Sequence, residues 1–562
     1  MFIRAKNRGN RTYLQIVENK RLNGKVVQSV KATLGRLDIL QKTGQLDSLL
    51  RSGLRFAQKL LVLDAHKNGE TTTTCTKKIG AVLLFERLWK ESGIKSVLAG
   101  LLEGRNFQFP LERVLFTAVL HRLFYPGSDR STEKWMRAYA IDGIDTSIAL
   151  HHFYRTMGWL GEPLPEKEQI NATPFMWRAH KDLIEECLFS LRRNLFSQLE
   201  IVFFDTTSLH FEGAGGSYLG KRGHSKNKRS DLNQIVVGVV IDNSGNPICS
   251  EIMPGNTTDV KTLIPVVQRL KRQFGVQRVC IVADRGMTSA STIAEMERLD
   301  WDYIVGVRMR KLVEVRDAVL VENRKKRNQY EEIYPARIKV HDPAPLEVRE
   351  ECIDGRRYIV CHNEEEARKD RYSRDAIITA LQKQLKQGDK SLIGNKGYRR
   401  FLKQSKSHFE IDDEKIAIDA RFDGKWVLRT NLAIDKKDVA LKYKQLLMVE
   451  DIFRTMKSVL DTRPIYHQCN DNISGHVFVS FLALVLRKNL QDRIDAKGWQ
   501  IEWADLIRDV DAIEEITITH DKKQFIIRNE VSGIAGKAFQ AVGVALPPVL
   551  REVEKCGTTP VP

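Results

Sequence analysis

The stretch Ile201-Val-Phe-Phe-Asp205 decides the fold, together with a second stretch of the same kind, Cys280-Ile-Val-Ala-Asp284. Each is a short apolar run that closes on an aspartate, a pattern typical of a buried strand. Further strand-like segments follow at 234–241, 247–253 and 303–307, with helix-like segments at 259–274 and 291–299. Three strands, a helix, a strand, a helix and a strand predict a mixed five-stranded α/β sheet layered with helices.

Length and charge limit what such a chain can do. Its 562 residues exceed what one core accommodates, and 42% hydrophobic with 29% charged residues is a soluble globular composition. A formal net charge of +19 favours a polyanionic partner. We find no 18-residue apolar run and no signal peptide, which favours nucleic acid over membrane and predicts the cytoplasm. The eight cysteines include no Cys-x-x-Cys pair, so no zinc ribbon or disulfide framework is indicated.

The chain before the sheet changes pattern twice. Residues 11–18 and 24–34 are rich in β-branched residues and predict a hairpin, and a short helical segment follows. Residues 68–78 are Thr-rich and predict a polar linker. The pattern is then helical from 79 to 196, with Arg113, Arg122, Arg130 and Lys134 as expected surface cations. This helical domain is either a solvated bundle or a DNA-end-binding domain, and its sequence does not decide between them.

The chain after the sheet predicts an insertion. About 120 residues, 308–431, are too many for a plain loop. They predict hairpins at 346–352 with 356–360 and at 415–422 with 425–428, and a charged helix at 364–386. Two basic runs, 324–327 and 396–400, are either solvated surface or a DNA track, and the net charge favours the track. Helices at 441–460 and 476–490 are expected to pack back on the sheet, and an α/β appendage follows.

These patterns give six predicted segments. They are an N-terminal β-hairpin and helix segment (1–67), a helical domain (79–197), the first part of the α/β core (198–307), a β-rich insertion domain (308–431), the second part of the core (432–495) and a C-terminal appendage (496–562).

Three carboxylates in this frame, Asp205, Asp284 and Glu450, can fold together into one magnesium site. Magnesium prefers a few carboxylate oxygens together with water and substrate phosphate. Two Mg²⁺ ions about 4 Å apart can activate an attacking oxygen and stabilise a leaving one. In so basic a chain the expected substrate is a nucleic-acid phosphodiester. The alternatives are that Asp284 caps the following helix and that Asp205 accepts a hydrogen bond in a turn.

Glu450 belongs to a row of residues with regular spacing. Tyr443, Glu450 and Lys457 lie seven residues apart, nearly two helical turns, so we expect them on one face. Glu450 can hold metal while Tyr443 and Lys457 grip flanking phosphates, and Arg454 lies close to that face. The alternative is an exposed stripe with a Glu450–Arg454 pair.

As a set, these motifs resemble the DDE transposases of bacterial insertion sequences, in the branch with a β-strand insertion and a Y-x2-R-x3-E-x6-K signature. Tyr443, Glu450 and Lys457 have the signature spacing, and Phe-Phe-Asp205-Thr-Thr and Val-Ala-Asp284-Arg-Gly-Met match the other acidic motifs. Further matching segments are 12–17, 34–37, 429–431 and 463–467. The signature arginine is replaced by Leu446.

The resemblance implies a ribonuclease-H-like core in which Asp205, Asp284 and Glu450 hold two Mg²⁺ ions, which Mn²⁺ can replace. It implies nicking at terminal inverted repeats, after which the 3′-OH attacks the opposite strand or target DNA. Leu446 puts a hairpin intermediate in question, because the arginine's phosphate contact has to come from elsewhere, for example from Arg454. A homodimer acting at the bacterial nucleoid is also implied.

The expected DNA contacts are Tyr443, Lys457, Arg454, Trp426, Arg285, Lys226, Lys228 and Arg229. Trp426 resembles an insertion-domain tryptophan that stacks on a flipped base, and a core tryptophan is the alternative. The basic segment 221–229 is otherwise a solvated loop. Two other functions compete: a nuclease or resolvase on the same core, which the insertion disfavours, and a DNA-binding protein that has lost catalysis, which the intact acids disfavour.

Overall fold

The chain folds into two compact units in the computed structural model. The first comprises 1–80, 511–533 and 545–562, and the second 81–510 and 534–544. The structure describes residues 2–22, 25–54, 62, 65–69, 71–192, 200–223, 229, 231–276, 278–321, 324–333, 346–386, 398–405, 408–520 and 523–553.

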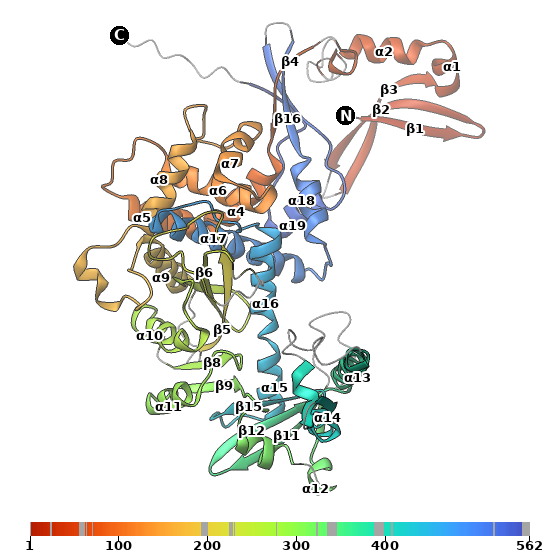
Figure 1. Ribbon diagram of the computed structural model, residues 1–562. Helices are drawn as coiled ribbons and strands as arrows, with labels where there is room; N and C mark the ends of the chain where they lie inside the picture. The colour runs from red at the N-terminus through yellow and green to blue at the C-terminus, as the bar shows by residue number, and fades with distance from the viewer. Residues whose placement is uncertain are drawn as a thin grey trace. The chain divides into compact units, whose positions relative to one another are not determined.

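A nine-stranded sheet, here called the core sheet, runs through the second unit in the order β10-β11-β12-β15-β9-β8-β5-β6-β7 (Figure 1). The part of the sheet that comes first in the sequence contains β5 (Glu200–His210), β6 (Gln234–Ile241), β7 (Pro247–Pro254), β8 (Val279–Ala283) and β9 (Asp302–Gly306). β6 is antiparallel to β5 and β7, whereas β8 is parallel to β5 and β9. This confirms the predicted mixed five-stranded sheet and is consistent with a ribonuclease-H-like core.

Apolar runs become the central strands because both of their faces are covered. Val202 and Phe204 of β5 pack in one core with Val266 and Leu270 of α10 (Leu263–Gln273). The helix α11 (Ala290–Arg298) contributes Met296 to the same core. Burying such side chains removes each from water at a gain of about 1.5–3 kcal/mol. Since side chains alternate along a strand, Asp205 points away from this core, to the other face of the sheet.

The insertion extends the core sheet. β15 (Lys425–Thr430) pairs antiparallel with β9, and β12 (Arg356–His362), β11 (Leu346–Ile353) and β10 (Glu331–Ile333) follow outward. The predicted β11–β12 hairpin is confirmed. Its turn residues, Asp354 and Gly355, have φ values of 48° and 72°, the positive values that a tight hairpin turn requires.

The second predicted hairpin of the insertion is wrong, because its first half is the helix α14 (Asp413–Ala420). Asp412 caps this helix by accepting a hydrogen bond from Lys415 N at 3.2 Å. Ile416 packs with Leu381 of the long helix α13 (Glu364–Lys386), whereas Ile418, two residues on, is exposed. A two-stranded ribbon, β13 (Leu402–Ser405) with β14 (His408–Ile411), completes this part.

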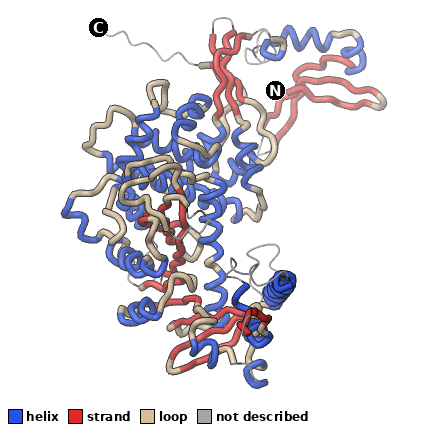
Figure 2. Tube along the Cα trace, in the orientation of Figure 1, coloured by secondary structure: helices blue, strands red, loops and turns tan. Residues whose placement is uncertain are grey.

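Helices gather beside the core sheet in the second unit (Figure 2). They are α4 (Gly80–Glu91), α5 (Ile94–Leu102), α6 (Leu111–Phe124), α7 (Asp129–Trp135), α8 (Leu150–Gly161), α9 (His180–Arg192), α17 (Asn470–Asp495), α18 (Trp503–Asp511) and α19 (Ala535–Val542). By length and composition alone α17 could cross a membrane, although it contains no 18-residue run of apolar residues. However, 83% of its apolar window is buried inside the protein, and it packs against α6 and α8 as a core helix.

Two of the expected surface cations of the helical domain are not at the surface. Arg122 is 3% exposed and donates to His476 Nδ1 at 3.0 Å. Arg113 is largely buried between Glu86 and Glu112, donating to the Glu86 carboxylate at 2.7 Å. Both cations therefore stabilise the bundle instead of facing a partner.

The first unit contains two sheets. One is β1 (Phe2–Arg8), β2 (Arg11–Leu22) and β3 (Lys25–Arg36), followed by α1 (Leu37–Lys42) and α2 (Gln45–Leu54). Its hairpin was predicted, and β1 was not. The other pairs β4 (Thr72–Lys78) with β16 (Glu514–His520), β17 (Lys523–Arg528) and β18 (Leu550–Glu552). The predicted linker at 68–78 is therefore wrong, because its threonines, β-branched residues, form a strand.

Candidate active site

Asp205 and Asp284 lie on neighbouring parallel strands. Phe204 of β5 is paired with Ala283 of β8, so the two aspartates follow directly on paired residues. Adjacent strands are about 4.8 Å apart, which places both carboxylates in one neighbourhood. Asp205 does not end its strand as predicted, since β5 continues to His210.

The structure decides between the two roles considered for Asp284. The helix α11 is capped by Ser289, which accepts from Thr292 N at 3.1 Å, so Asp284 is not its cap. From the loop that follows it, the Asp284 carboxylate receives a long contact of 3.5 Å from Gly286 N. Asp205 does accept a local hydrogen bond, from Thr206 N at 2.7 Å.

The segment that carries Glu450 is not the single regular helix predicted for 441–460. It consists of α15 (Lys436–Lys444), α16 (Leu447–Arg454) and a π-helical turn, η7 (Thr455–Val459). At the junction of α15 and α16, Leu446 N donates to Tyr443 O at 3.0 Å, a tighter three-residue bond. The helix thus tightens before Glu450 and widens after it, and a seven-residue spacing no longer marks one face.

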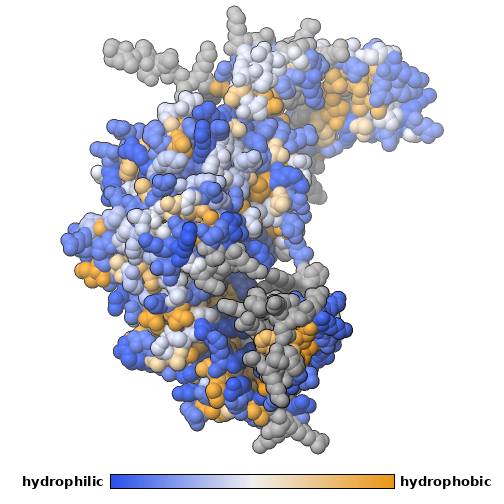
Figure 3. All heavy atoms as spheres, viewed as in Figure 1, coloured by the Kyte–Doolittle hydropathy of each residue, from blue (hydrophilic) through white to orange (hydrophobic). Residues whose placement is uncertain are grey.

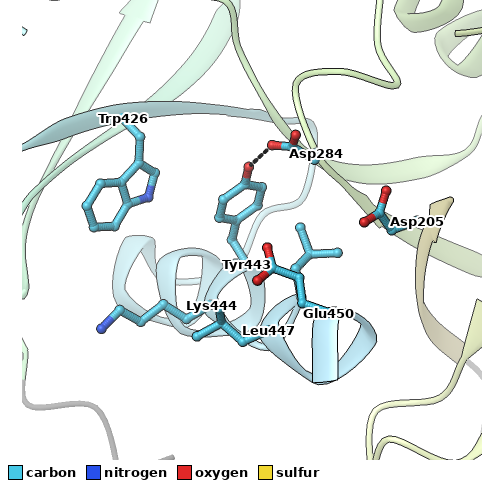
Figure 4. A pocket seen from close by; sticks show the side chains of 8 residues that line it. Asp205, Asp284, Trp426, Tyr443, Lys444, Leu447 and Glu450 are labelled. Carbon is cyan, nitrogen blue, oxygen red and sulfur yellow. Dashed lines mark hydrogen bonds between the residues drawn. The ribbon is translucent and has the colours of Figure 1, made fainter. Parts of the chain in front are cut away.

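Tyr443 and Glu450 nevertheless line the same pocket as the two aspartates. A pocket of about 220 Å³ is lined by Asp205, Asp284, Trp426, Tyr443, Lys444, Leu446, Leu447 and Glu450. Figure 4 shows Tyr443 and Glu450 directed toward the two aspartates, with Trp426 on the far side of Tyr443. Lys457, from the π-helical turn, is not among the lining residues.

Tyr443 holds the Asp284 carboxylate. Its hydroxyl donates to Asp284 Oδ1 at 3.1 Å. Burial, and then the charge of Asp284, raise the pKa of the Tyr443 phenol well above its ordinary value of 10.0, so the hydroxyl keeps its proton. Gly306, at the end of β9, makes room for this hydroxyl, because a Cβ there would overlap it.

Arg308 fixes the loop that follows Asp284. The Arg308 guanidinium donates to Arg285 O at 3.2 Å and to Gly286 O at 3.3 Å. The side chain of Arg285 itself is exposed. The loop is therefore held through its backbone, which leaves the Arg285 side chain available to a ligand.

The other expected DNA contacts have varied surroundings. Arg454 forms an ion pair with Asp451 at 3.0 Å and not with Glu450. Arg229 pairs with Asp231 at 3.0 Å, and Lys226 and Lys228 lie outside the described residues. Trp426 is half-buried and lines the pocket, so it is not a core tryptophan.

The chemistry of the pocket is that of a cation site. Its three carboxylates, Asp205, Asp284 and Glu450, offer the oxygen donors that Mg²⁺ and Mn²⁺ prefer. Asp284 and Glu450 are exposed, so water and a phosphate can reach them. Glu450 lies in the first turn of α16, where the helix dipole favours a negative charge.

A second group of metal-ligand types is better explained as a structural network. Ligand atoms of Asp129, His467 and His476 lie within 4.8 Å of one another. However, Arg122 donates to His476 Nδ1, and His476 Nε2 lies 3.1 Å from Thr462 O. Both ring nitrogens are thus in use beside a fixed positive charge, which disfavours a cation.

Sequence reasoning missed several residues of the site. Lys444 and Leu447 line the pocket, Gly306 gives Tyr443 its space, and Arg308 holds the loop after Asp284. The position of Lys444 next to Tyr443 was a usable signal. Gly306 and Arg308 contact residues that are distant in sequence, so their local sequence gives no indication of their roles.

Comparison with known families adds an independent observation. The model described as "Transposase DDE domain" matches residues 196–342, which include Asp205 and Asp284. The model described as "IS1634 family transposase, N-terminal domain" matches residues 2–66. A search of curated proteins gave no match. The two family matches support the assignment of this chain to the DDE transposases of bacterial insertion sequences.

Proposed function

We propose that this chain is a Mg²⁺-dependent transposase that cuts and joins DNA at the terminal inverted repeats of its own element. One observation carries the proposal: Asp205, Asp284 and Glu450, far apart in sequence, line one pocket. Family membership by itself implies a DNA-acting transposase; the substrate, the metal and the reaction steps are what we propose.

Asp205, Asp284 and Glu450 are the residues that would hold two divalent ions. Such a pair, Mg²⁺ or Mn²⁺, supplies activation of an attacking oxygen and stabilisation of a leaving oxygen in phosphodiester displacement. Tyr443 keeps the Asp284 carboxylate turned toward the pocket through its 3.1 Å hydrogen bond. A carboxylate held in one orientation loses less entropy when it binds a ligand.

The reaction proceeds in two stages. Water first breaks a phosphodiester bond at the end of the element, which leaves a free 3′-OH. That hydroxyl then attacks a second phosphodiester in the opposite strand or in target DNA, forming one bond as another breaks. Arg285, exposed beside Asp284, and Lys444, in the pocket lining, are placed to contact backbone phosphates.

Trp426 is suited to receive an unstacked base. It lines the same pocket as the carboxylates, it is half-buried, and an aromatic face binds any base by stacking. A flipped base accompanies a hairpin step, which Leu446 puts in question. Leu446 lines the pocket with an apolar side chain where the signature has a cation, and Arg454 is paired with Asp451, so neither supplies a phosphate contact in this arrangement.

Two element ends cut in concert call for a homodimer acting on DNA in the bacterial cytoplasm. The competing function is a DNA-binding protein that has lost catalysis, or a nuclease without strand transfer. A duplex that carries the element's own terminal repeat, incubated with the protein and Mg²⁺, distinguishes them. Nicking with a 3′-OH followed by joining supports a transposase, nicking alone supports a nuclease, and binding without nicking supports the decayed protein.

A further inference from the structure

One face of the N-terminal sheet β1–β2–β3 carries a connected row of polar side chains. Arg4 is paired with Gln15, and Gln15 with Thr33, so all three project from the same face. Arg4 donates to Gln15 Oε1 at 3.1 Å and to Gln28 Oε1 at 2.7 Å. Gln15 Nε2 donates to Thr33 Oγ1 at 3.3 Å. Hydrogen bonds across three strands thus hold these side chains in place; we call Arg4, Gln15, Gln28 and Thr33 the polar row.

Cations continue the same face toward the β1–β2 turn. Lys6 is paired with Tyr13, and Arg8 with Arg11, so Lys6, Arg8 and Arg11 share the face of Arg4. All three are exposed, and none forms an ion pair within the described part of the chain. Over residues 2–36 nine lysines and arginines stand against one glutamate.

The opposite face of the sheet is used for packing. Leu14, which points to that side, is buried, and a Cβ on Gly35 would contact Leu40 of α1 at 3.4 Å. Lys31 is tied to Glu18 on that side at 3.1 Å. Figure 3 shows hydrophilic residues beside a hydrophobic band on this unit. One face of the sheet therefore packs on its own helix. The other carries the polar row between a basic end and an apolar end, where Val17 is buried and is paired with Phe2 and Val30.

Charge and donor pattern together identify the partner. A basic face attracts any polyanion, but Arg, Gln and Thr side chains are the ones that pair with base edges in the major groove. Neighbouring strands lie about 4.8 Å apart, and the major groove, about 12 Å wide, accommodates two neighbouring strands of such a sheet. An anionic membrane would use the cations but not a hydrogen-bonded amide row.

We propose that this face enters the major groove of double-stranded DNA, where the polar row reads bases and Lys6, Arg8 and Arg11 contact phosphates. The proposal rests on the proposed function, because the DNA sequence that this face would recognise is the element's terminal repeat. It places end recognition in the first unit, whereas the helical domain was the expected reader. The burial of Arg113 and Arg122 agrees with this placement.

The test uses fluorescence anisotropy of the full chain with a labelled terminal-repeat duplex and a scrambled duplex, in Ca²⁺ to prevent cutting. Arg4→Ala and Gln15→Ala are expected to weaken binding to the repeat by about 5- to 150-fold each, with little change on the scrambled duplex. Arg8→Ala and Arg11→Ala are expected to weaken both and to lower the salt slope by about 0.9 each. Lys31→Ala removes the same charge from the opposite face and is the matched control.

A second measurement needs no variant. Methylation of guanine N7, which lies in the major groove, is expected to interfere with binding of the wild-type protein. Three results would each overturn the proposal. The Arg4→Ala variant could bind the repeat with wild-type affinity, or it could lose the same affinity on the repeat and on the scrambled duplex. The third is that anionic vesicles compete the repeat off the protein. Nicking by the wild-type protein in Mg²⁺ is measured in the same preparation. If nicking persists while these variants bind normally, only this inference fails and the proposed function stands.

Discussion

The contact between Tyr443 and Asp284 gives a sharp prediction at Gly306. An alanine Cβ at this position would overlap the Tyr443 hydroxyl and approach Arg285 N to 3.0 Å. The hydroxyl then has to move by about 1 Å to regain contact distance, and a misplacement of that size costs on the order of 100-fold in rate. We therefore expect Gly306→Ala to slow nicking by about 100-fold.

Tyr443→Phe removes the same interaction by another route. A hydrogen bond to a charged group contributes about 1.5–3 kcal/mol, so the nicking rate should fall by about 10- to 150-fold. Because both substitutions act on one hydrogen bond, the double variant should be little slower than the slower single variant. Single-turnover nicking of a terminal-repeat duplex in Mg²⁺ measures all three rates.

Controls separate positioning from damage to the fold. Gly100→Ala makes the same substitution in α5, where an added Cβ meets nothing within 4 Å, and should leave the nicking rate unchanged. Binding of the repeat in Ca²⁺ should stay near the wild-type value for every variant. Wild-type nicking by Tyr443→Phe, or rate losses that multiply fully in the double variant, would refute the role given to this hydrogen bond.

Three further predictions concern the site's departure from the signature and the stability of the core. Leu446→Arg should raise the slope of log K against log salt for the terminal repeat by about 0.9, through one added phosphate contact, whereas Leu446→Met should not; equal slopes would contradict the placement of Leu446 beside DNA. Burial lowers the pKa of His121 from 6.5 to about 3, so the stability it contributes is present above pH 6.5 and falls as the pH drops toward 3. Between pH 7 and pH 5, urea denaturation should show a loss of stability to which His121 contributes about 2 kcal/mol; His121→Gln should make this loss smaller by that amount, whereas the exposed His151→Gln should not. Phe204→Ala, in the core between β5 and α10, should lower the free energy of unfolding by about 3–5 kcal/mol in the same assay, and a loss under 1 kcal/mol would show that this core is not well packed.

The sequence was sufficient for the elements whose pattern is set by burial on both faces. The runs around Val202 and Val282 are apolar without alternation, and both are central strands of the core sheet. The sequence was insufficient where the secondary structure depends on pairing or packing with a segment distant in sequence, or on a helix cap. The Thr-rich sequence of β4 predicts a polar linker, but pairing with β16 makes it a strand. The alternating pattern around Ile416 predicts a strand, but Asp412 caps a helix there.

The candidate site divides in the same way. The three acids could be selected from their residue type and apolar surroundings, but only tertiary structure brings Glu450 to the aspartates. The break between α15 and α16 has no glycine or proline to announce it. The seven-residue spacing pointed to Tyr443 and Glu450, which do share the pocket, and to Lys457, which does not line it.

Asp205, Asp284 and Glu450 are inferred to act together on DNA. The most direct test is a nicking assay on the element's terminal repeat with the near-isosteric variants Asp205→Asn, Asp284→Asn and Glu450→Gln, and with Asp451→Asn, the neighbouring acid on α16, as control. We predict that each of the first three loses nicking in Mg²⁺ while still binding the repeat in Ca²⁺, and that Asp451→Asn nicks normally. Nicking at the wild-type rate by any of the three would contradict the account.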